Sequence, residues 1–452
     1  MTNKGGKKMQ DGLRIINPEK LSTSGKIPCD RIQVGGRMGY KPNMVRLSDG
    51  ELLMTNFHTH FEVNNDGSMC EHIVLHRSSD AGKTWISQHY DHLWGREPYL
   101  NVFSDGTLII TTHFLTEDVR NQTGHCNVWL HRSEDRGHTW KSRNLDIDQI
   151  PADVSATYSS RNIIELDDGS YVMGVGCGND NDFLFISKDK GTSWKIAKMR
   201  ISGFDNNSYK YSILQEGIFF RTNSNRVLLF ARCDIRQMNF DRKIPGLPEF
   251  DFSETSDSDH YDVEIIFESK DNGISWEPLN AVPLVGCMYP SICDSGGGKY
   301  LFTFTQRIPN EKMRMGVYAF FLEEQENGFM KSDPGHDLIV IDEKTPDYLQ
   351  SGGGFGNTLM LDDGSFITPY SYLDADPEIE ELMKTGRFRD QDTFNFYRDK
   401  ALQYYRGWVN HVTWERTINV DHILQYHHFL GCCRVLNLCG PVTEVAKWKL
   451  VP

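Results

Sequence analysis

Apolar and polar positions alternate along much of the chain and predict β-strands joined in pairs. In "PNMVRLSDGELLMTNF", a strand runs into the turn at Asp49-Gly50 and a second, more apolar strand follows. An Asp-Gly pair between alternating strands is a strong hairpin signal. The pattern returns at Asp105-Gly106, Asp168-Gly169 and Asp363-Gly364, and in weaker form at residues 223–225 and 296–298. The sequence therefore predicts six hairpins at intervals of roughly sixty residues.

A second pattern, S-x-D-x-G-x-[T/S]-W, occurs four times between these hairpins. The four segments, which we call octets, are Ser78 to Trp85, Ser133 to Trp140, Ser187 to Trp194 and Ser269 to Trp276. Each follows an alternating strand. Its aspartate suits a hydrogen bond to the turn backbone, and its glycine supplies a positive φ. Each octet thus predicts a further hairpin corner, with its tryptophan packed on the outgoing strand.

Two hairpins per unit make a four-stranded antiparallel sheet, and six such sheets set radially make an all-β, six-bladed β-propeller. We expect residues 1–30 to form an N-terminal extension and residues 31–452 the propeller. The final strand in "TEVAKWKLVP" should complete the last blade. The early strand "RIQVGG" should close the ring and remove its exposed edges.

Two insertions interrupt the repeat. Residues 236–262 form a long polar insertion. Residues 374–407 are predicted to be helical, because Asp376 suits a helix cap, Pro377 the first turn and Gly386 the helix end. Insertions on a propeller commonly wall the central cleft or form an interface, and the sequence does not decide between these roles.

Composition narrows the possible partners. The net charge of −14 over 452 residues argues against nucleic acid, which needs a basic surface. No run of about 18 apolar residues occurs, so no membrane span is expected. The start "MTNKGGKKMQ" does not resemble a signal peptide. A cytoplasmic chain and a trimmed secreted or periplasmic chain both remain open, as does the oligomeric state. The ten cysteines are scattered and predict buried thiols, with no metal and no cofactor expected.

The inner strands of a propeller point their starts at a central cavity, which makes those starts the place to look for chemistry. A charged residue at one strand end is ordinarily a solvated rim group, but convergence from several blades predicts a functional cleft. The polar residues at these starts are Arg37, Tyr40, Lys41, Arg96, Glu97, Tyr99, Tyr158, Arg161, Glu216 and Tyr289.

The octets resemble the Asp-box (BNR) motif of the sialidase (neuraminidase) superfamily, whose enzymes are six-bladed propellers. The resemblance covers the chain from about Gly36 to its end and identifies it as a divergent member. It implies that the octets lie on the blade rim, away from the site, and the motif also occurs in propellers with unrelated roles. It further implies a sialidase-like hydrolase acting on an acidic glycan. Such a site holds an arginine trio that clamps a carboxylate, an aspartic acid–base and a tyrosine nucleophile paired with a glutamate.

Several positions match these roles. "EGIFFRTNSNRVLLFAR" resembles the fourth blade of the family, so Glu216 matches the glutamate and Arg232 the second arginine. "NNDGSMCEHIVLHRSSDAG" resembles the stretch that carries the acid–base, which places Asp66 in that role. The third arginine matches Arg314, with Arg307 as its rival.

Two positions depart from the family pattern. The slot for the first arginine holds Tyr40, with Arg37 and Lys41 beside it. The slot for the nucleophile holds Phe355, which has no oxygen with which to attack carbon. The sequence therefore predicts no covalent sialic-acid adduct, unless another tyrosine, such as Tyr370, fills the space.

Histidines and other tyrosines supply alternative acid–base groups. His58 and His60 lie at i, i+2 on a strand, with Glu62 in phase, and His113 lies at the corresponding place in the second blade. They suit acid–base work in a lyase acting on a uronic-acid glycan, with Tyr40 as partner. A metal site and two exposed histidines without a role are the other interpretations.

Three functions thus remain open: a glycosidase, a polysaccharide lyase and a glycan-binding propeller without activity. The candidate catalytic residues are Asp66, Glu216, His58, His60 and Tyr40. The candidate substrate-binding residues are Arg37, Arg96, Arg161, Arg232, Arg314, Tyr158 and Tyr372.

Overall fold

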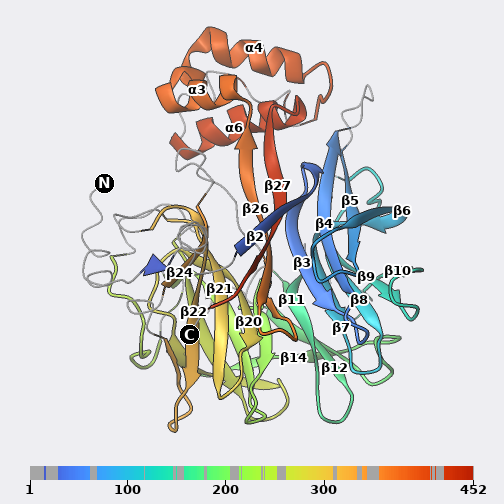
Figure 1. Cartoon of the computed structure of the whole chain (residues 1–452), viewed down its shortest axis with the longest axis vertical. Coiled ribbons are helices and arrows are strands. Elements are labelled where there is room, and N and C mark those ends of the chain that lie inside the picture. Colours follow the sequence, from blue (N-terminus) through green and yellow to red (C-terminus); the bar gives the residue numbers. More distant parts are fainter. Residues whose placement is uncertain are drawn as a thin grey trace.

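The computed structural model describes most of the chain. The described residues are 15–16, 29–61, 69–116, 118–145, 157–177, 181–203, 213–214, 216–235, 240–251, 261–308, 313–332, 338–343, 356–407 and 422–450, with a few single positions between them. Figure 1 shows β-sheets arranged around an axis, with a group of helices above one side of them.

Six sheets, numbered blades 1 to 6 in chain order, confirm the predicted six-bladed all-β propeller. The strands below are given from the axis outward. Blade 1 contains β3 (Tyr40–Arg46), β4 (Leu52–Phe61), β5 (Met69–Ser78) and β6 (Ile86–Trp94). Blade 2 contains β7 (Arg96–Val102), β8 (Leu108–Phe114), β9 (Asn127–Ser133) and β10 (Lys141–Asn144). Blade 3 contains β11 (Thr157–Glu165), β12 (Tyr171–Cys177), β13 (Asn181–Ser187) and β14 (Lys195–Lys198).

Blades 4 and 5 carry short extra strands. Blade 4 contains β16 (Ile218–Arg221), β17 (Val227–Cys233), β18 (Val263–Ser269) and β19 (Ser275–Ala281), with β15 (Arg200–Ile201) outside them. Blade 5 contains β20 (Cys287–Asp294), β21 (Lys299–Gln306), β22 (Gly316–Glu324) and β24 (Leu338–Asp342), with β23 (Met330–Ser332) also on β22. Blade 6 contains β25 (Leu359–Met360), β26 (Phe366–Ala375), β27 (Cys439–Trp448) and β2 (Cys29–Arg37).

The ring closes through its two ends. Strand β2 contains "RIQVGG" and pairs antiparallel with the C-terminal strand β27, with Cys29 opposite Trp448. This confirms the expected closure, and β2 begins two residues before the expected boundary at residue 31. Within the expected N-terminal extension, β1 (Ile15–Ile16) pairs in parallel with β24 of blade 5.

Polar side chains on the inner strands tie neighbouring blades together. Each amide or hydroxyl oxygen accepts a hydrogen bond from a backbone N–H of the adjacent blade. This bond gives a buried backbone N–H the partner that it would otherwise lack. The acceptor–donor pairs are Asn43 with Leu100 (2.7 Å), Asn101 with Ile163 (2.8 Å), Asn162 with Phe219 (2.7 Å), Ser291 with Thr358 (3.1 Å) and Asn357 with Met44 (2.7 Å). These bonds hold the inner strands, and therefore the side chains at their starts, in fixed relative positions.

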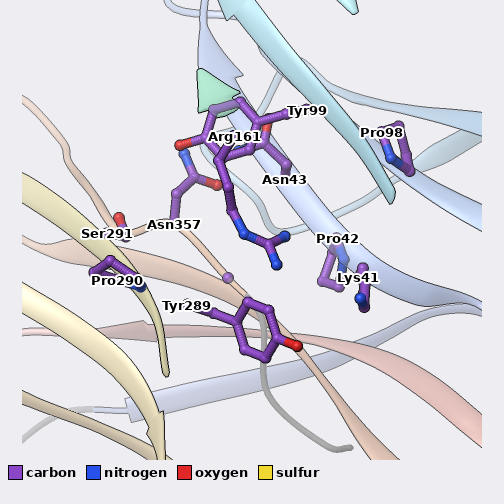
Figure 2. Close-up of a pocket in the computed structure, with 11 residues that line it drawn as sticks. Lys41, Pro42, Asn43, Pro98, Tyr99, Arg161, Tyr289, Pro290, Ser291 and Asn357 are labelled. Carbon is purple, nitrogen blue, oxygen red and sulfur yellow. The ribbon is translucent and has the colours of Figure 1, made fainter. Parts of the chain in front are cut away.

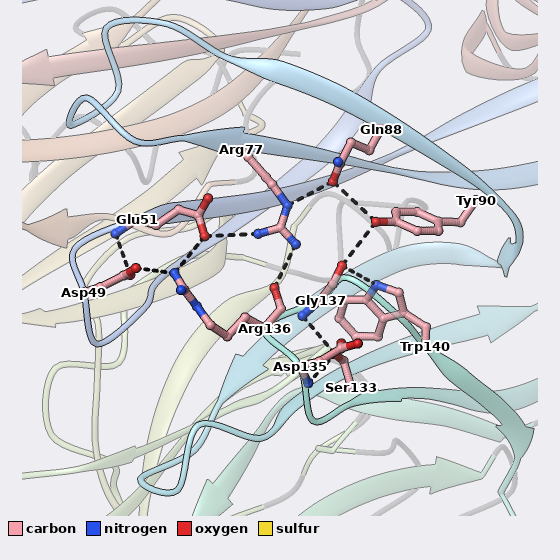
Figure 3. A network of polar contacts seen from close by, with 10 residues as sticks. All are labelled: Asp49, Glu51, Arg77, Gln88, Tyr90, Ser133, Asp135, Arg136, Gly137 and Trp140. Atoms are coloured by element: carbon pink, nitrogen blue, oxygen red, sulfur yellow. Dashed lines mark hydrogen bonds and ion pairs between the residues drawn. The ribbon is translucent and has the colours of Figure 1, made fainter.

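The octets lie between the third and fourth strands of blades 1 to 4, on the outer half of each blade. In the second octet, Asp135 accepts hydrogen bonds from the Ser133 hydroxyl and the Thr139 backbone, each at 2.8 Å. Figure 3 shows the same turn held against blade 1, where Arg77 donates to the Arg136 carbonyl at 2.7 Å. The octets thus act as scaffold between blades.

The octet aspartates predict a loss of stability in acid. Hydrogen bonds from Thr84 lower the pKa of Asp80 to about 2, and those from Ser193 do the same for Asp189. Because these pKa values lie below the unfolded value of 3.8, the stabilisation is complete above pH 3.8 and is lost as the pH falls toward 2. Urea unfolding across this range should show a smaller loss in the double variant Asp80→Asn/Asp189→Asn than in wild type. An identical loss in both proteins would contradict this origin.

The helical insertion packs against blades 6 and 1. It contains α3 (Pro377–Thr385), a 3-10 turn (Arg387–Arg389) and α4 (Gln391–Ala401), and α6 (His422–Val435) joins it from beyond the predicted range. Gly386 ends α3 at a φ of 70°, as expected. Asp376 precedes α3 without capping it and instead binds Arg37 at 3.0 Å. Within the described residues, no helix is long and apolar enough to cross a membrane.

Among the described residues of the other insertion, Asp262 forms an ion pair with Arg232, and residues 240–251 lie along the outer side of blade 4. The Ala281 backbone in β19 donates to the Pro245 carbonyl at 2.7 Å, and Asp241 donates to the Gly203 carbonyl at 3.0 Å. This part of the insertion therefore covers the outer strand and not the axis.

Candidate active site

Unusual backbone geometry places polar side chains on the propeller axis. The inner strands of blades 1, 2 and 5 each shift register near their start. There, Lys41, Glu97 and Tyr289 have φ values of 51°, 55° and 56°, and Glu216 ahead of β16 has 64°. Residues other than glycine rarely adopt this left-handed conformation, and such strain gathers at functional sites. The repeated bulge is therefore the first structural sign of a site.

Two glutamates and three cations form an ion-pair network at this point. Glu216 accepts hydrogen bonds from Arg161 at 2.9 Å and from Arg232 on its other oxygen. Lys41 contacts Glu97, and its Nζ lies 3.9 Å from Glu216. Arg161 also lies 3.7 Å from Glu97. Residues from blades 1 to 4 thus meet in one cluster, which we call the axial cluster.

Tyr289 from blade 5 lies among these cations. The guanidinium carbons of Arg161 and Arg307 lie 4.2 and 4.9 Å from its ring centre, and the Lys41 Nζ lies 5.2 Å away. Such distances are typical of cation–π contacts. Arg307 also donates to the Tyr289 hydroxyl at 2.8 Å. Figure 2 shows Tyr289 and Arg161 facing each other across the pocket. The phenol therefore lies in a positively charged environment.

Burial and neighbouring charges set the ionisation of the cluster. Burial alone would raise the pKa of Glu216, but Arg232 and Arg161 hold it well below 4.5. Burial lowers the pKa of Lys41 to about 8, against the opposing effect of Glu97 and Glu216. Burial raises the pKa of Tyr289 well above 10, although Arg307 counteracts it. At neutral pH the carboxylates are charged, the phenol is protonated and Lys41 is close to its titration point.

Two further acidic side chains, Asp262 and Glu264, lie close to Arg232. Its Nε donates to Asp262. Glu264, opposite Arg232 in the β17–β18 pairing, is fully buried, and burial raises its pKa well above 4.5. Among the described residues, the charged groups of the cluster are Lys41, Arg161, Arg232 and Arg307 against Glu97, Glu216 and Asp262. Four basic side chains thus surround three ion-paired carboxylates, and such a concentration of basic groups suits an anionic ligand.

The axial cluster borders a small pocket (Figure 2). Lys41, Arg161 and Tyr289 line it together with backbone and side chains of Pro42, Pro290 and Asn357. The pocket is partly open to its surroundings, and its space for the centres of water molecules is about 20 Å³.

The structure brings several predicted residues into or beside the cluster. Glu216, Arg161 and Arg232 form its centre, and the Tyr40 ring lies 5.6 Å from the Lys41 Nζ. Arg96 is at the edge, where its Nε lies 3.1 Å from Glu71 and its side chain is 40% exposed.

Tyr158 and His113 form a neighbouring layer. Their rings pack edge to face at 5.2 Å, and His113 lies opposite Arg96 in the β7–β8 pairing. Burial lowers the pKa of His113, which is therefore neutral at neutral pH.

Three predicted substrate-binding residues lie elsewhere. Arg37 ends β2, the outermost strand of blade 6, and binds Asp374 at 2.7 Å beside the helical insertion. Arg314 is exposed, and its rival Arg307 occupies the position against Tyr289. Tyr372 is on β26 and packs in the core between blades 5 and 6. Of these three, only Arg37 was expected among the strand starts that converge on the axis, and the structure instead places it at the end of the outermost strand of blade 6.

The histidines also lie away from the axial cluster. The His58 ring is 6.2 Å from His60 and 6.5 Å from His89, and the His60 ring is 5.3 Å from His72. His58 and His60 lie on β4, the second strand from the axis, and His72 and His89 lie on β5 and β6 of the same blade. Among the described residues, no group of three or more His, Cys, Asp or Glu side chains is arranged to hold a metal ion. Asp66, Glu62 and Phe355 lie outside the described residues.

Tyr370, the alternative source of a phenol, is not on the axis. Its hydroxyl donates to Glu444 on β27 and accepts from Arg31 on β2 at 2.8 Å. The side chain is fully buried between the strands of blade 6 and its neighbour. Its contacts are those of a structural residue.

Lys41, Glu97 and Tyr289 are among the residues that the sequence predicts to converge, but the family resemblance assigns them no role. A sharper signal was present: each directly precedes a proline at the start of an inner strand, in "YKPN", "REPYL" and "CMYPS". Proline removes a backbone donor and disfavours helical geometry in the residue before it, so a repeated X-Pro at this position indicates a repeated bulge.

Several solved structures have a fold similar to that of this chain. A protein of unknown function from Dyadobacter fermentans is 16% identical, with a TM-score of 0.54, over 77% of this chain and 95% of its own. The NanB sialidase from Streptococcus pneumoniae is 11% identical, with a TM-score of 0.50, over 78% of this chain and 68% of its own. This chain has the sialidase fold. No protein-family model and no curated protein matches the sequence. At these identities the sialidase fold alone is shown, and the activity has to be argued from the site.

Proposed function

We propose that this protein is a sialidase-like glycoside hydrolase that acts on a carboxylated sugar. The observation that carries the proposal is the convergence of Arg161, Arg232 and Arg307 on the axis around the hydroxyl-bearing Tyr289. A guanidinium has five N–H donors and binds a ligand carboxylate while it holds a neighbouring carboxylate of the protein.

In this proposal Tyr289 supplies the nucleophilic phenol that is missing at Phe355. A phenol suits an anionic sugar, because a carboxylate nucleophile would be repelled by it. Arg307 stabilises the phenolate through its bond to the Tyr289 hydroxyl. Asp66 keeps the acid–base role that the family resemblance implies. We rank the lyase hypothesis with His58 or His60 second, because the ring contacts of these histidines are with His72 and His89.

Incubation with a panel of sialylated and uronic-acid glycans tests the proposal. We expect new reducing ends without the ultraviolet absorbance of an unsaturated uronate. Reducing ends together with that absorbance would identify a lyase. Binding of acidic glycans without any new reducing ends would identify a binding protein and contradict the proposed hydrolase.

A further inference from the structure

The helical insertion covers the end of the propeller at which the inner strands start. Strand β3 begins at Tyr40 opposite Phe57 of β4, so the last residue of β4, Phe61, lies at the same end of blade 1. The Phe61 ring packs on Tyr405 of the insertion, with ring centres 4.9 Å apart. Helix α6 contacts β27, and Figure 1 shows it on the side of the insertion that faces the sheets. The insertion therefore lies on the same side of the propeller as the axial cluster.

Arg37 fastens the end of α6 to the segment that leads into Tyr40. Its guanidinium donates to the Asn437 carbonyl at 2.9 Å and binds Asp374 at 2.7 Å. The Asn437 backbone in turn donates at 2.9 Å to the carbonyl of Arg434, which lies in the last turn of α6. The last turn of α6 is therefore held beside the chain that enters the axial cluster.

Arg434 is half-buried and has no acidic partner within the described part of the chain. Its Nε is shielded from solvent without a hydrogen-bond partner, and no described carboxylate forms an ion pair with its guanidinium. The chain has 62 acidic and 48 basic side chains, so acidic groups are not scarce. Removing a guanidinium from water is costly unless a hydrogen-bonded anion compensates. This side chain is therefore suited to an anion that the protein itself does not supply.

Tyr40 links Arg434 to the axial cluster. The Tyr40 ring packs against Met288 and Tyr289. Burial raises the pKa of the Tyr40 phenol, and the charges of Arg307 and Arg434 oppose this rise. An anion bound at Arg434 is therefore next to the axial cluster, although a different element of the fold holds it.

We propose that Arg434 binds a second acidic group of the glycan, on a sugar next to the one whose carboxylate binds on the axis. This inference rests on the proposed function and narrows its substrate class to oligosaccharides with acidic groups on two neighbouring sugars. Arg434 is outside the ion-pair network that holds Arg161 and Arg232, so we assign it to a separate group of the ligand. A carboxylate and a sulfate both suit a guanidinium, which offers two parallel N–H donors.

The binding of thio-linked disaccharides tests this assignment, because their glycosidic sulfur resists hydrolysis. In each, a carboxylated sugar is joined to a second sugar that is carboxylated, sulfated or neutral. We expect Arg434→Gln to weaken the binding of at least one doubly acidic ligand by about tenfold, and to change that of the neutral one by less than about twofold. Arg434→Lys, which keeps the charge, should lose less affinity. Calorimetry at fixed ionic strength measures each dissociation constant.

Arg387→Gln is the matched control, because it removes one positive charge from an exposed position of the same insertion. It should leave all three dissociation constants unchanged. Equal affinities of wild type and Arg434→Gln for both doubly acidic ligands, or equal losses in Arg387→Gln, would overturn the inference. A loss of stability in Arg434→Gln with unchanged affinity would also overturn it, and would identify Arg434 as a charge that stabilises the C-terminal end of α6.

The same disaccharides with oxygen linkages separate this inference from the proposed function. We expect wild type to release new reducing ends from the doubly acidic ligands. Cleavage together with an unchanged affinity in Arg434→Gln would leave the hydrolase in place and remove the second acidic group. An affinity that depends on Arg434, without any cleavage, would support the second binding position and contradict the proposed hydrolase.

Discussion

Replacing Tyr289 with phenylalanine is expected to reduce hydrolysis of a carboxylated glycoside by about 10³-fold or more. The variant keeps the aromatic ring that Lys41, Arg161 and Arg307 contact, and loses only the hydroxyl to which Arg307 donates. The fold should therefore survive while the nucleophile is lost. Initial rates for the variant and wild type, with circular dichroism to confirm folding, measure the effect.

Tyr370→Phe is the matched control. It too removes a buried hydroxyl that accepts from an arginine, but in blade 6 and off the axis. It should lower the free energy of unfolding by about 1–2 kcal/mol and leave the turnover of folded protein unchanged. A fluorinated carboxylated sugar that traps the intermediate should add mass to the peptide containing Tyr289. An adduct on another tyrosine, or full activity in Tyr289→Phe, would remove Tyr289 as nucleophile.

Replacing Arg232 with alanine should weaken the binding of a carboxylated monosaccharide by about 1.5–3 kcal/mol, because a charge-assisted pair is lost. It also leaves Glu216 and Asp262 buried without this partner, which should cost about 3–5 kcal/mol of stability. Calorimetry below the melting temperature of the variant separates the two effects.

Arg314→Ala is the control for Arg232→Ala. Arg314 is exposed, so its loss should change neither affinity nor stability measurably. Arg307→Ala should weaken binding as Arg232→Ala does, since Arg307 holds the axial position. Unchanged affinity in Arg232→Ala, or a larger loss in Arg314→Ala than in Arg307→Ala, would contradict this arrangement of the clamp.

The propeller fold could be predicted from the sequence because the turn motifs that specify its hairpins are local and repeated. An Asp-Gly turn such as Asp49-Gly50, or an octet such as Ser133 to Trp140, specifies its hairpin within a few residues. Closure by β2 followed from the need to cover a free edge. Helix α6 was missed. Its segment is apolar around Phe429, Cys432 and Cys433, which are all buried, so no one-sided pattern marks it as a surface helix.

The residues of the site could be predicted from the sequence only in part. Which side chains reach the axis depends on β-bulges and on the strand to which each residue belongs. "GRMGYKPN" was interpreted as one inner-strand start, whereas Arg37 ends the outermost strand of blade 6 and Tyr40 begins the innermost strand of blade 1. A few residues of chain therefore place Arg37 and Lys41 on different blades. The choice between Arg307 and Arg314 likewise depends on where β21 ends, which the hydrophobic pattern does not specify.

A crystal structure with a bound carboxylated monosaccharide tests the central claim most directly. We expect the sugar on the propeller axis, with its carboxylate within hydrogen-bond distance of Arg161, Arg232 or Arg307 and its anomeric carbon facing Tyr289. The competing location is the hollow of about 390 Å³ on the outer side of blade 6, where Arg31, Lys83 and Lys447 offer positive charge. A sugar bound there, with no sugar on the axis, would contradict the assignment of the axial cluster as the active site.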